Sequence, residues 1–346
     1  MKKFISVILS LIVILSLASC SSASNQMYSN ESVILFDTYC SISAYDSSQK
    51  RFDEHYSLVF DELQKYSMLF DIYNSYDELV NLKYINENAA LSPVKADEKI
   101  IDILEYGKKA HDLTDGRVNI AMGSVLSVWH EKREQGIDNP ENAVLPEMKE
   151  LKRNSEHCDI NKLIIDEENH TVYFNDSEMQ LDIGAIAKGY VTEKICGFIK
   201  ENNIWQSAVI SLGGNVKVIG TKYNDGSSKF NIAVESPKDD DYLCTVGVSD
   251  GYSVVTSGDY QRYYTVDGVD YCHIINPDTL MPSDFMSSVT VICKDSSFAD
   301  ITSTMLFNMS IRDGLYFVEH SSNLEAVWVD KDNGITYSSG FKDYMN

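Results

Sequence analysis

Basic residues are scarce in this chain of 346 residues, where 29 Lys and Arg stand against 52 Asp and Glu, giving a formal net charge of −23. A nucleic-acid-binding protein needs basic patches to meet phosphates, so this balance argues against a nucleic-acid partner. It also argues against docking on anionic lipid by charge alone. The hydrophobic content of 44% predicts a packed globular body instead.

Metal-binding cysteine motifs are also absent. The seven cysteines show no CxxC or similar spacing, and most lie in apolar runs, as at Cys40 and Cys293. We therefore expect buried thiols rather than metal ligands or disulfides. The sequence has no internal repeat and no clear linker after residue 30, so we expect one catalytic body over residues 31–346.

The N-terminus has the pattern of an export signal. The apolar run Phe4–Leu17 follows two lysines and is too short for a comfortable membrane span. It ends in Leu-Ala-Ser-Cys20, which resembles a bacterial lipobox. We expect residues 1–20 to be a lipoprotein signal peptide, Cys20 to be lipidated, and residues 21–30 to be a polar tether. The protein would then be exported and anchored on the extracytoplasmic face of the cell membrane. An ordinary cleaved signal and an uncleaved anchor are the alternatives.

Hydrophobic periodicity predicts both helices and strands along the rest of the chain. Helical spacing predicts helices over 51–70, 97–114 and 185–202. Strand patterns are found at 32–45, 163–174 (a hairpin), 180–183, 207–212, 216–220, 230–234, 245–248, 252–256, and 260–275 (a second hairpin). Because the two kinds of element are mixed rather than strictly alternating, the sequence favours an α+β fold over a doubly wound sheet.

The segment Val289–Phe307 reads as a strand, a polar turn and a helix. Asp300 and Thr304 lie four residues apart at the start of that helix and therefore share one face, near a positive helix N-terminus. A carboxylate and a hydroxyl on a rigid element suit Mg²⁺, which takes few protein ligands and is completed by phosphate and water. The alternative is a capping Asp followed by a buried Thr.

Glycine-rich turns supply candidate phosphate contacts. Leu181–Tyr190 reads as a strand, a glycine turn and a helix start, where free N–H groups attract anions and Lys188 adds positive charge. The segment is neither a Walker A loop nor a GxGxxG fingerprint, and a tight packing turn is an equal alternative. Arg262 is a candidate anion contact, and His273 is either a general base or an ordinary core or surface histidine.

Five motifs in order then change the interpretation. The succession LDIGAIAKGY, SLGGN, TSGDYQRYY, HIINPDT and FADITSTMLF closely resembles the FAD:protein FMN transferase (ApbE) family, once described as thiamine-biosynthesis lipoproteins. Phe36-Asp37-Thr38 and Thr114-Asp115-Gly116 also fit the family pattern. The resemblance covers residues 32 to 340 and implies a single ApbE-like, T-fold-like body, with mixed or antiparallel sheets and packed helices.

The resemblance implies an enzyme that binds FAD and Mg²⁺, transfers FMN to a Thr or Ser hydroxyl of a target protein through a phosphoester bond, and releases AMP. The implied metal ligands are the Ala185 carbonyl, Asp300 and Thr304, and the implied catalytic residues are His273 and Asp300. The implied flavin-nucleotide contacts are Phe36, Tyr73, Ala121, Met122, Gly123, Asp182, Lys188, His273 and Ile274. The acceptor would carry a flavinylation motif, as an FMN-binding redox lipoprotein or an ion-pumping oxidoreductase subunit does.

Four residues depart from the family pattern. Phe36 and Asp37 replace the common Met and Gly, Cys272 stands where many members have a second His, and Asn276 stands where Asp is usual. The first pair implies a different shape at the flavin entrance, and Cys272 puts proton transfer in doubt. Two other functions stay open: an FAD pyrophosphatase that uses water as acceptor, and a flavin-binding lipoprotein without catalysis.

Overall fold

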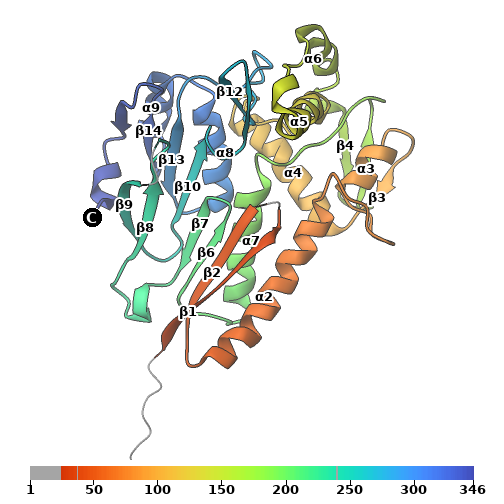
Figure 1. The fold of residues 1–346 in the computed structure, drawn as a ribbon. Coiled ribbons are helices and arrows are strands. Elements are labelled where there is room, and N and C mark those ends of the chain that lie inside the picture. Colours follow the sequence, from red (N-terminus) through yellow and green to blue (C-terminus); the bar gives the residue numbers. More distant parts are fainter. Residues whose placement is uncertain (1–24, 37, 239–240) are drawn as a thin grey trace, which may run out of the picture.

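A computed structural model describes residues 25–36, 38–238 and 241–346, and its main sheet has eight strands within these ranges (Figure 1). In sheet order, they are β1 (Gln26–Leu35), β2 (Thr38–Asp46), β6 (Ala208–Leu212), β7 (Asn215–Ile219), β10 (Ser253–Gly258), β13 (Ser288–Cys293), β14 (Glu325–Val329) and β15 (Ile335–Tyr337). Every neighbouring pair is antiparallel. The predicted α+β class with antiparallel sheets and packed helices is confirmed.

Smaller sheets lie around this frame. Their strands are β3 (Val94–Lys95), β4 (Leu163–Asp166), β5 (Thr171–Phe174), β8 (Phe230–Glu235), β9 (Tyr242–Val248), β11 (Tyr263–Val266) and β12 (Val269–Cys272). They pair as β3-β5-β4, β8-β9 and β11-β12. The β8–β9 pair packs with the main sheet around Val218, Val254 and Ile292, so this face of the sheet is covered by other strands.

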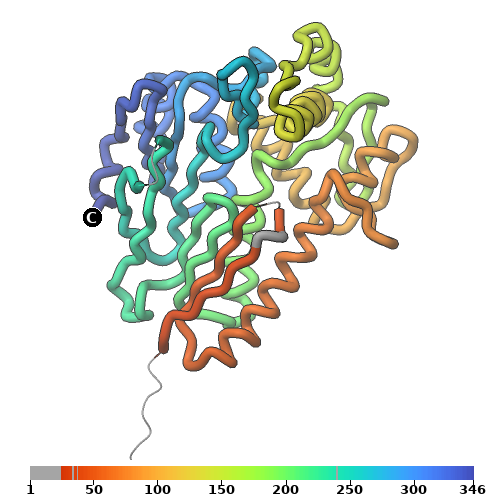
Figure 2. The backbone as a smooth tube through the Cα atoms, in the orientation of Figure 1, coloured from red at the N-terminus to blue at the C-terminus, as the bar shows by residue number. Residues whose placement is uncertain are grey.

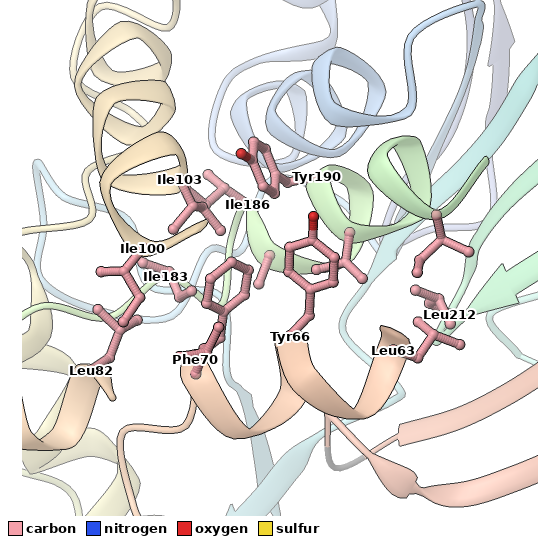
Figure 3. Packing of buried hydrophobic residues seen from close by; sticks show 14 of the residues in the cluster. Leu63, Tyr66, Phe70, Leu82, Ile100, Ile103, Ile183, Ile186, Tyr190 and Leu212 are labelled. Atoms are coloured by element: carbon pink, nitrogen blue, oxygen red, sulfur yellow. The ribbon is translucent and has the colours of Figure 1, made fainter. Parts of the chain in front are cut away.

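Helices pack against the main sheet and against one another. They are α2 (Gln49–Leu69), α3 (Leu82–Asn88), α4 (Glu98–Leu113), α5 (Gly123–Asp138), α6 (Met148–Ser155), α7 (Ala187–Glu201), α8 (Ser296–Phe307) and α9 (Ile311–Glu319). Figure 3 shows Tyr66 of α2 and Phe70, the residue after that helix, facing Ile186 and Tyr190 at the start of α7, with Ile103 of α4 beside them. Within the described ranges, no helix is both long enough and apolar enough to cross a membrane.

All six residues of β13 are buried, because α8 covers one face of this central strand and the β8–β9 side covers the other. This explains why its sequence, SVTVIC, does not alternate as a half-exposed strand would. The strand leads through a two-residue turn into α8, so the predicted strand–turn–helix at 289–307 is confirmed.

Four expectations about elements are corrected. Residues 32–45 form not one strand but a hairpin, which turns at Phe36 with φ of 52°. Strand β1 begins at Gln26, so most of the described part of the predicted tether belongs to the sheet, while residues 1–24 lie outside the described residues. The tube in Figure 2 shows β1 starting far from α5 and α6. Residues 180–183 form no strand, and only a single parallel bridge joins Gln180 to Met122.

The fourth correction concerns residues 123–155, which contain helices α5 and α6 although hydrophobic periodicity predicted no helix there. Helix α5 starts at a glycine and ends in polar residues, so its apolar stripe is short. Its packing against β11 decides its conformation: a Cβ on Gly136 would lie 2.7 Å from the Tyr264 ring. Tertiary contact outweighs a weak local signal here.

Candidate active site

Asp300 is held between α7 and β7. The side chain is 3% exposed, and its Oδ2 accepts a hydrogen bond of 2.7 Å from the Gly189 amide. Its Oδ1 lies 3.4 Å from Asn215 Nδ2, which donates from β7. Helices α7 and α8 approach so closely that a Cβ on Gly189 of α7 would lie 2.3 Å from the Ser296 carbonyl oxygen of α8. A glycine at 189 is therefore required for this carboxylate to reach the start of α7.

Asp300 is not the cap of α8. Asp295 caps the helix, and its side chain accepts from the Phe298 amide at 3.0 Å, so Asp300 lies in the second turn rather than at the helix start. The alternative that Asp300 is a helix cap is therefore wrong. Asp300 also lies farther from the N-terminus of α8 than the sequence predicted. Thr304 follows one turn later on the same face and is half-buried.

The oxygen atoms around Asp300 fit a hard cation such as Mg²⁺. Gly189 lies in the first turn of α7, where amides have no partner inside the helix, and its amide donates to Asp300 rather than to the Ala185 carbonyl before the helix. Among the described residues, buried Asn215 Oδ1 accepts no hydrogen bond, which is costly unless a cation meets it. All of these donors are oxygens, as Mg²⁺ prefers.

No group of three or more His, Cys, Asp and Glu side chains in the described ranges could hold a metal ion. A magnesium ion here would therefore rely on the Asp300 carboxylate with carbonyl and hydroxyl oxygens, as a substrate phosphate site does. Burial raises the pKa of Asp300, whereas the charge of Lys188 and the hydrogen bonds from Gly189 and Asn215 act in the opposite direction. A bound cation would favour the ionised carboxylate further.

The predicted cofactor segments at 121–123 and 181–183 lie side by side. The Asp182 amide donates to the Ile120 carbonyl at 2.9 Å, and the Asp182 Oδ1 accepts from the Gly184 amide at 2.8 Å. A Cβ on Gly123 would lie 2.5 Å from the Gln180 carbonyl oxygen, so Gly123 permits this approach. Ala121 and Met122 are buried beneath the same contact.

The sequence predicted that His273 lies within a strand of a hairpin. In the structure, His273 instead follows the last residue of β12. Its Nδ1 lies 3.2 Å from the Arg262 carbonyl oxygen, which only accepts, so Nδ1 carries the proton and Nε2 is left as the basic atom. Burial lowers the pKa of His273 to about 3, and the charges of Lys188 and Arg262 act in the same direction. The imidazole is therefore neutral at physiological pH.

Lys188 connects the site residues electrostatically. Its charge acts on the pKa of Asp182, His273 and Asp300. Burial raises the pKa of Asp182, and the charges of His130, Arg133 and Lys188 oppose that rise. In a chain of net charge −23, this concentration of cations around one histidine suits an anionic ligand.

Residues close to His273 in the sequence have structural roles. The Ile274 carbonyl accepts from the Ser283 amide at 2.9 Å. Cys272 is buried, and burial raises its pKa, so this thiol stays protonated and does not act as a second histidine would. Asn276, where the family usually has Asp, caps its own turn by accepting from the Asp278 amide at 2.9 Å.

Phe36 and Tyr73 are the two aromatic residues of the implied flavin contacts. Phe36 is half-buried at the hairpin turn, where its amide donates to Ser67 Oγ at 3.3 Å, while its neighbour Asp37 lies outside the described residues. Tyr73 is 55% exposed and stacks on His130 with 4.7 Å between ring centroids. An exposed stacked ring of this kind suits an aromatic ligand.

Sequence reasoning missed His130, Arg133 and Asn86. Arg133 Nη2 lies 2.7 Å from His130 Nδ1, and the i,i+3 spacing of the two on α5 was the available signal. Asn86 bonds both backbone groups of Leu181, accepting from its amide at 2.8 Å and donating to its carbonyl at 2.9 Å. Nothing in the local sequence marks a single Asn for that contact across 95 residues.

Comparison with known proteins agrees with this geometry. A family model described as the ApbE family matches residues 36–328. The FAD:protein FMN transferase of Klebsiella pneumoniae is 30% identical over 285 residues, covering 82% of this chain and 84% of that protein. The FAD:protein FMN transferase of Treponema pallidum is 28% identical over 347 residues, covering 96% and 92%.

The fold is also found in solved structures. The crystal structure of the ApbE protein of Thermotoga maritima superposes with a TM-score of 0.80 at 26% identity, covering 93% of this chain and all of that one. The resemblance carried by the five sequence motifs is confirmed. Because the family model spans most of its length, the chain belongs to the ApbE family.

Proposed function

We propose that the protein is a Mg²⁺-dependent FAD:protein FMN transferase, which moves FMN from FAD to a Thr or Ser hydroxyl of an acceptor protein and releases AMP. The observation that carries the proposal is the buried Asp300 carboxylate, held by the Gly189 amide and by Asn215, with the charge of Lys188 acting on it and on His273. The similar proteins of Klebsiella pneumoniae and Treponema pallidum, both FAD:protein FMN transferases, support the same activity.

The chain's own residues supply the parts of a phosphoryl transfer. Lys188 and Arg262 bind the pyrophosphate of FAD, and Tyr73 and the segment 121–123 hold its rings. Asp300, Thr304 and the Ala185 carbonyl would hold Mg²⁺, which neutralises charge on the phosphoryl oxygens when bound. The phosphate charges of bound FAD would offset the cations that lower the pKa of His273, and Nε2 of His273 then accepts the proton of the acceptor hydroxyl. The hydroxyl oxygen then forms a bond to the FMN phosphorus as the bond to AMP breaks, and AMP leaves as an anion.

We also propose that the protein works outside the cytoplasm, attached to the membrane through lipid on Cys20. The support is the sequence pattern of residues 1–20, which lie outside the described residues. The acceptor would then be another exported protein, such as an FMN-binding redox lipoprotein or an ion-pumping oxidoreductase subunit. Labelling of cells with a radioactive fatty acid, with Cys20→Ala as control, tests the anchor.

One assay distinguishes the three candidate functions: FMN transferase, FAD pyrophosphatase and flavin-binding protein without catalysis. The purified protein is incubated with FAD, Mg²⁺ and an acceptor bearing an Asp-x-x-Ser/Thr-x-Ala-Thr motif, and the denatured acceptor is examined for covalent flavin fluorescence. An acceptor whose modified hydroxyl residue is changed to Ala is the control. Release of FMN and AMP without labelling would identify an FAD pyrophosphatase, and FAD binding without turnover would refute an enzyme.

A further inference from the structure

An ion pair in which Lys217 is buried and Glu193 is 36% exposed joins β7 to α7, the two elements that also contact Asp300. Lys217 of β7 is 3% exposed, and its Nζ lies 3.0 Å from Glu193 Oε2 on α7. The same carboxylate oxygen accepts a hydrogen bond of 2.7 Å from the amide of Ser296, the first residue of α8. Glu193 thus joins one helix to the N-terminus of the other, where a carboxylate is favoured.

The spacing of these contacts matches that of the contacts made by Asp300. Gly189 and Glu193 lie one turn apart on α7, and Ser296 and Asp300 lie one turn apart on α8. Gly189 bonds to Asp300, and Glu193 bonds to Ser296. The two helices are therefore joined at two points, which together fix how far one slides along the other.

Strand β7 supports both points in the same way. Asn215 and Lys217 alternate onto one face of the strand, and Asn215 donates to Asp300 while Lys217 pairs with Glu193. Lys217 also donates to the Gly251 carbonyl at 2.8 Å and the Lys294 carbonyl at 2.5 Å. Since Lys294 lies two residues before α8, this lysine holds the chain entering the helix that carries Asp300.

We propose that Glu193 and Lys217 are positioning residues, which set the register of α8 on α7 and so the place of the Asp300 carboxylate. The inference rests on the proposed function, because it gives that carboxylate a cation to hold. Neither residue contacts substrate in this scheme. Their effect reaches the reaction only through the helix, and it should be felt in Mg²⁺ binding before FAD binding.

The test compares Glu193→Gln with the wild type. The glutamine oxygen still accepts from the Ser296 amide but no longer neutralises Lys217. Mg²⁺ binding is measured by calorimetry on the full protein with FAD present, and FAD binding is measured without metal. We expect the Mg²⁺ concentration at half-saturation to rise by about 10–100-fold, as for partners that orient a metal ligand. FAD affinity should change less than about twofold.

Two further variants keep the test decisive. Lys217→Met removes the pair from the other side, and it should shift Mg²⁺ binding in the same direction even if Glu193→Gln folds poorly. Lys200→Gln is the control, since it breaks an exposed pair with Asp250 at 3.1 Å on the same helix. This variant should bind Mg²⁺ as the wild type does.

The outcomes separate this inference from the proposed function. A lowered melting temperature with unchanged Mg²⁺ half-saturation in both variants would mean a purely structural pair and would overturn the inference, while FMN transfer by the wild type continued. Shifted Mg²⁺ binding in a protein that transfers no FMN would support the pair and refute the function. A wild type that binds no Mg²⁺ would overturn both.

Discussion

Replacing Gly189 by alanine should displace the Asp300 carboxylate without changing a residue that we propose to contact FAD. A Cβ at this position would lie 2.3 Å from the Ser296 carbonyl oxygen and 2.4 Å from Asp300 Cβ. Ordinary van der Waals contacts between such atoms are about 3.5 Å, so α7 and α8 must separate by about 1 Å. The 2.7 Å hydrogen bond from the Gly189 amide to Asp300 must then lengthen or break.

The magnitude follows from two opposing terms. Overpacking of a tight contact costs about 1–3 kcal/mol, whereas alanine in place of glycine inside a helix contributes about 0.5–1 kcal/mol of stability. The net change is therefore a loss of up to about 2.5 kcal/mol. Activity should fall further, because a displacement of about 1 Å in a positioned group can cost about 10²-fold in rate.

Gly197 provides the matched control on the same helix. Outside the chain neighbours and the backbone of its own helix, no atom lies within 4 Å of a Cβ added there, so Gly197→Ala should stabilise the protein and leave activity unchanged. Thermal unfolding and FMN transfer are measured on both variants. If Gly189→Ala were stabilised like Gly197→Ala and transferred FMN at the wild-type rate, the close helix contact would have no role in placing Asp300.

Three further predictions concern the site itself. Asp300→Asn should reduce Mg²⁺-dependent FMN transfer by about 10²-fold or more while metal-free FAD binding, measured by fluorescence, persists; equal turnover would remove Asp300 from the site. Because the folded-state pKa of His273 lies near 3, below its unfolded value of about 6.5, its neutral form stabilises the protein fully above about pH 6.5, and this contribution declines as the pH falls toward 3. His273→Gln should flatten the pH dependence of the unfolding free energy across that window, and an unchanged slope would contradict a neutral buried imidazole. Arg133→Met should raise the KM for FAD by about 10–100-fold through loss of a charged contact, whereas Lys132→Met on the same helix should not, and equal KM values would place Arg133 outside the FAD site.

Local sequence patterns predicted the features that depend on neighbours within a few residues. The four-residue spacing of Asp300 and Thr304 put both on one face of a helix, and the turn at Gly213-Gly214 fell between two real strands. Both signals arise from backbone geometry, which repeats every 3.6 or two residues. The ordered motifs added the family, which the comparisons confirm.

Local sequence patterns did not predict contacts between segments that are far apart in the chain. Sequence spacing placed Asp300 at a helix start, but the capping role belongs to Asp295. It also gave no sign that β1 begins at Gln26, because the first half of this strand is mostly polar and pairs along its length with β2. Helix α5, with Arg133, was missed for a similar reason.

The sequence by itself determined the α+β class, the family and the chemical types of the site residues, since these follow from local periodicity and motif order. Only the tertiary structure decided how Asp300 is held: by the Gly189 amide 111 residues earlier and by Asn215 85 residues earlier. It also brought Lys217 to Glu193 and Glu193 to Ser296. These pairings depend on the packing of two helices on one strand, and packing is a property of the whole folded chain.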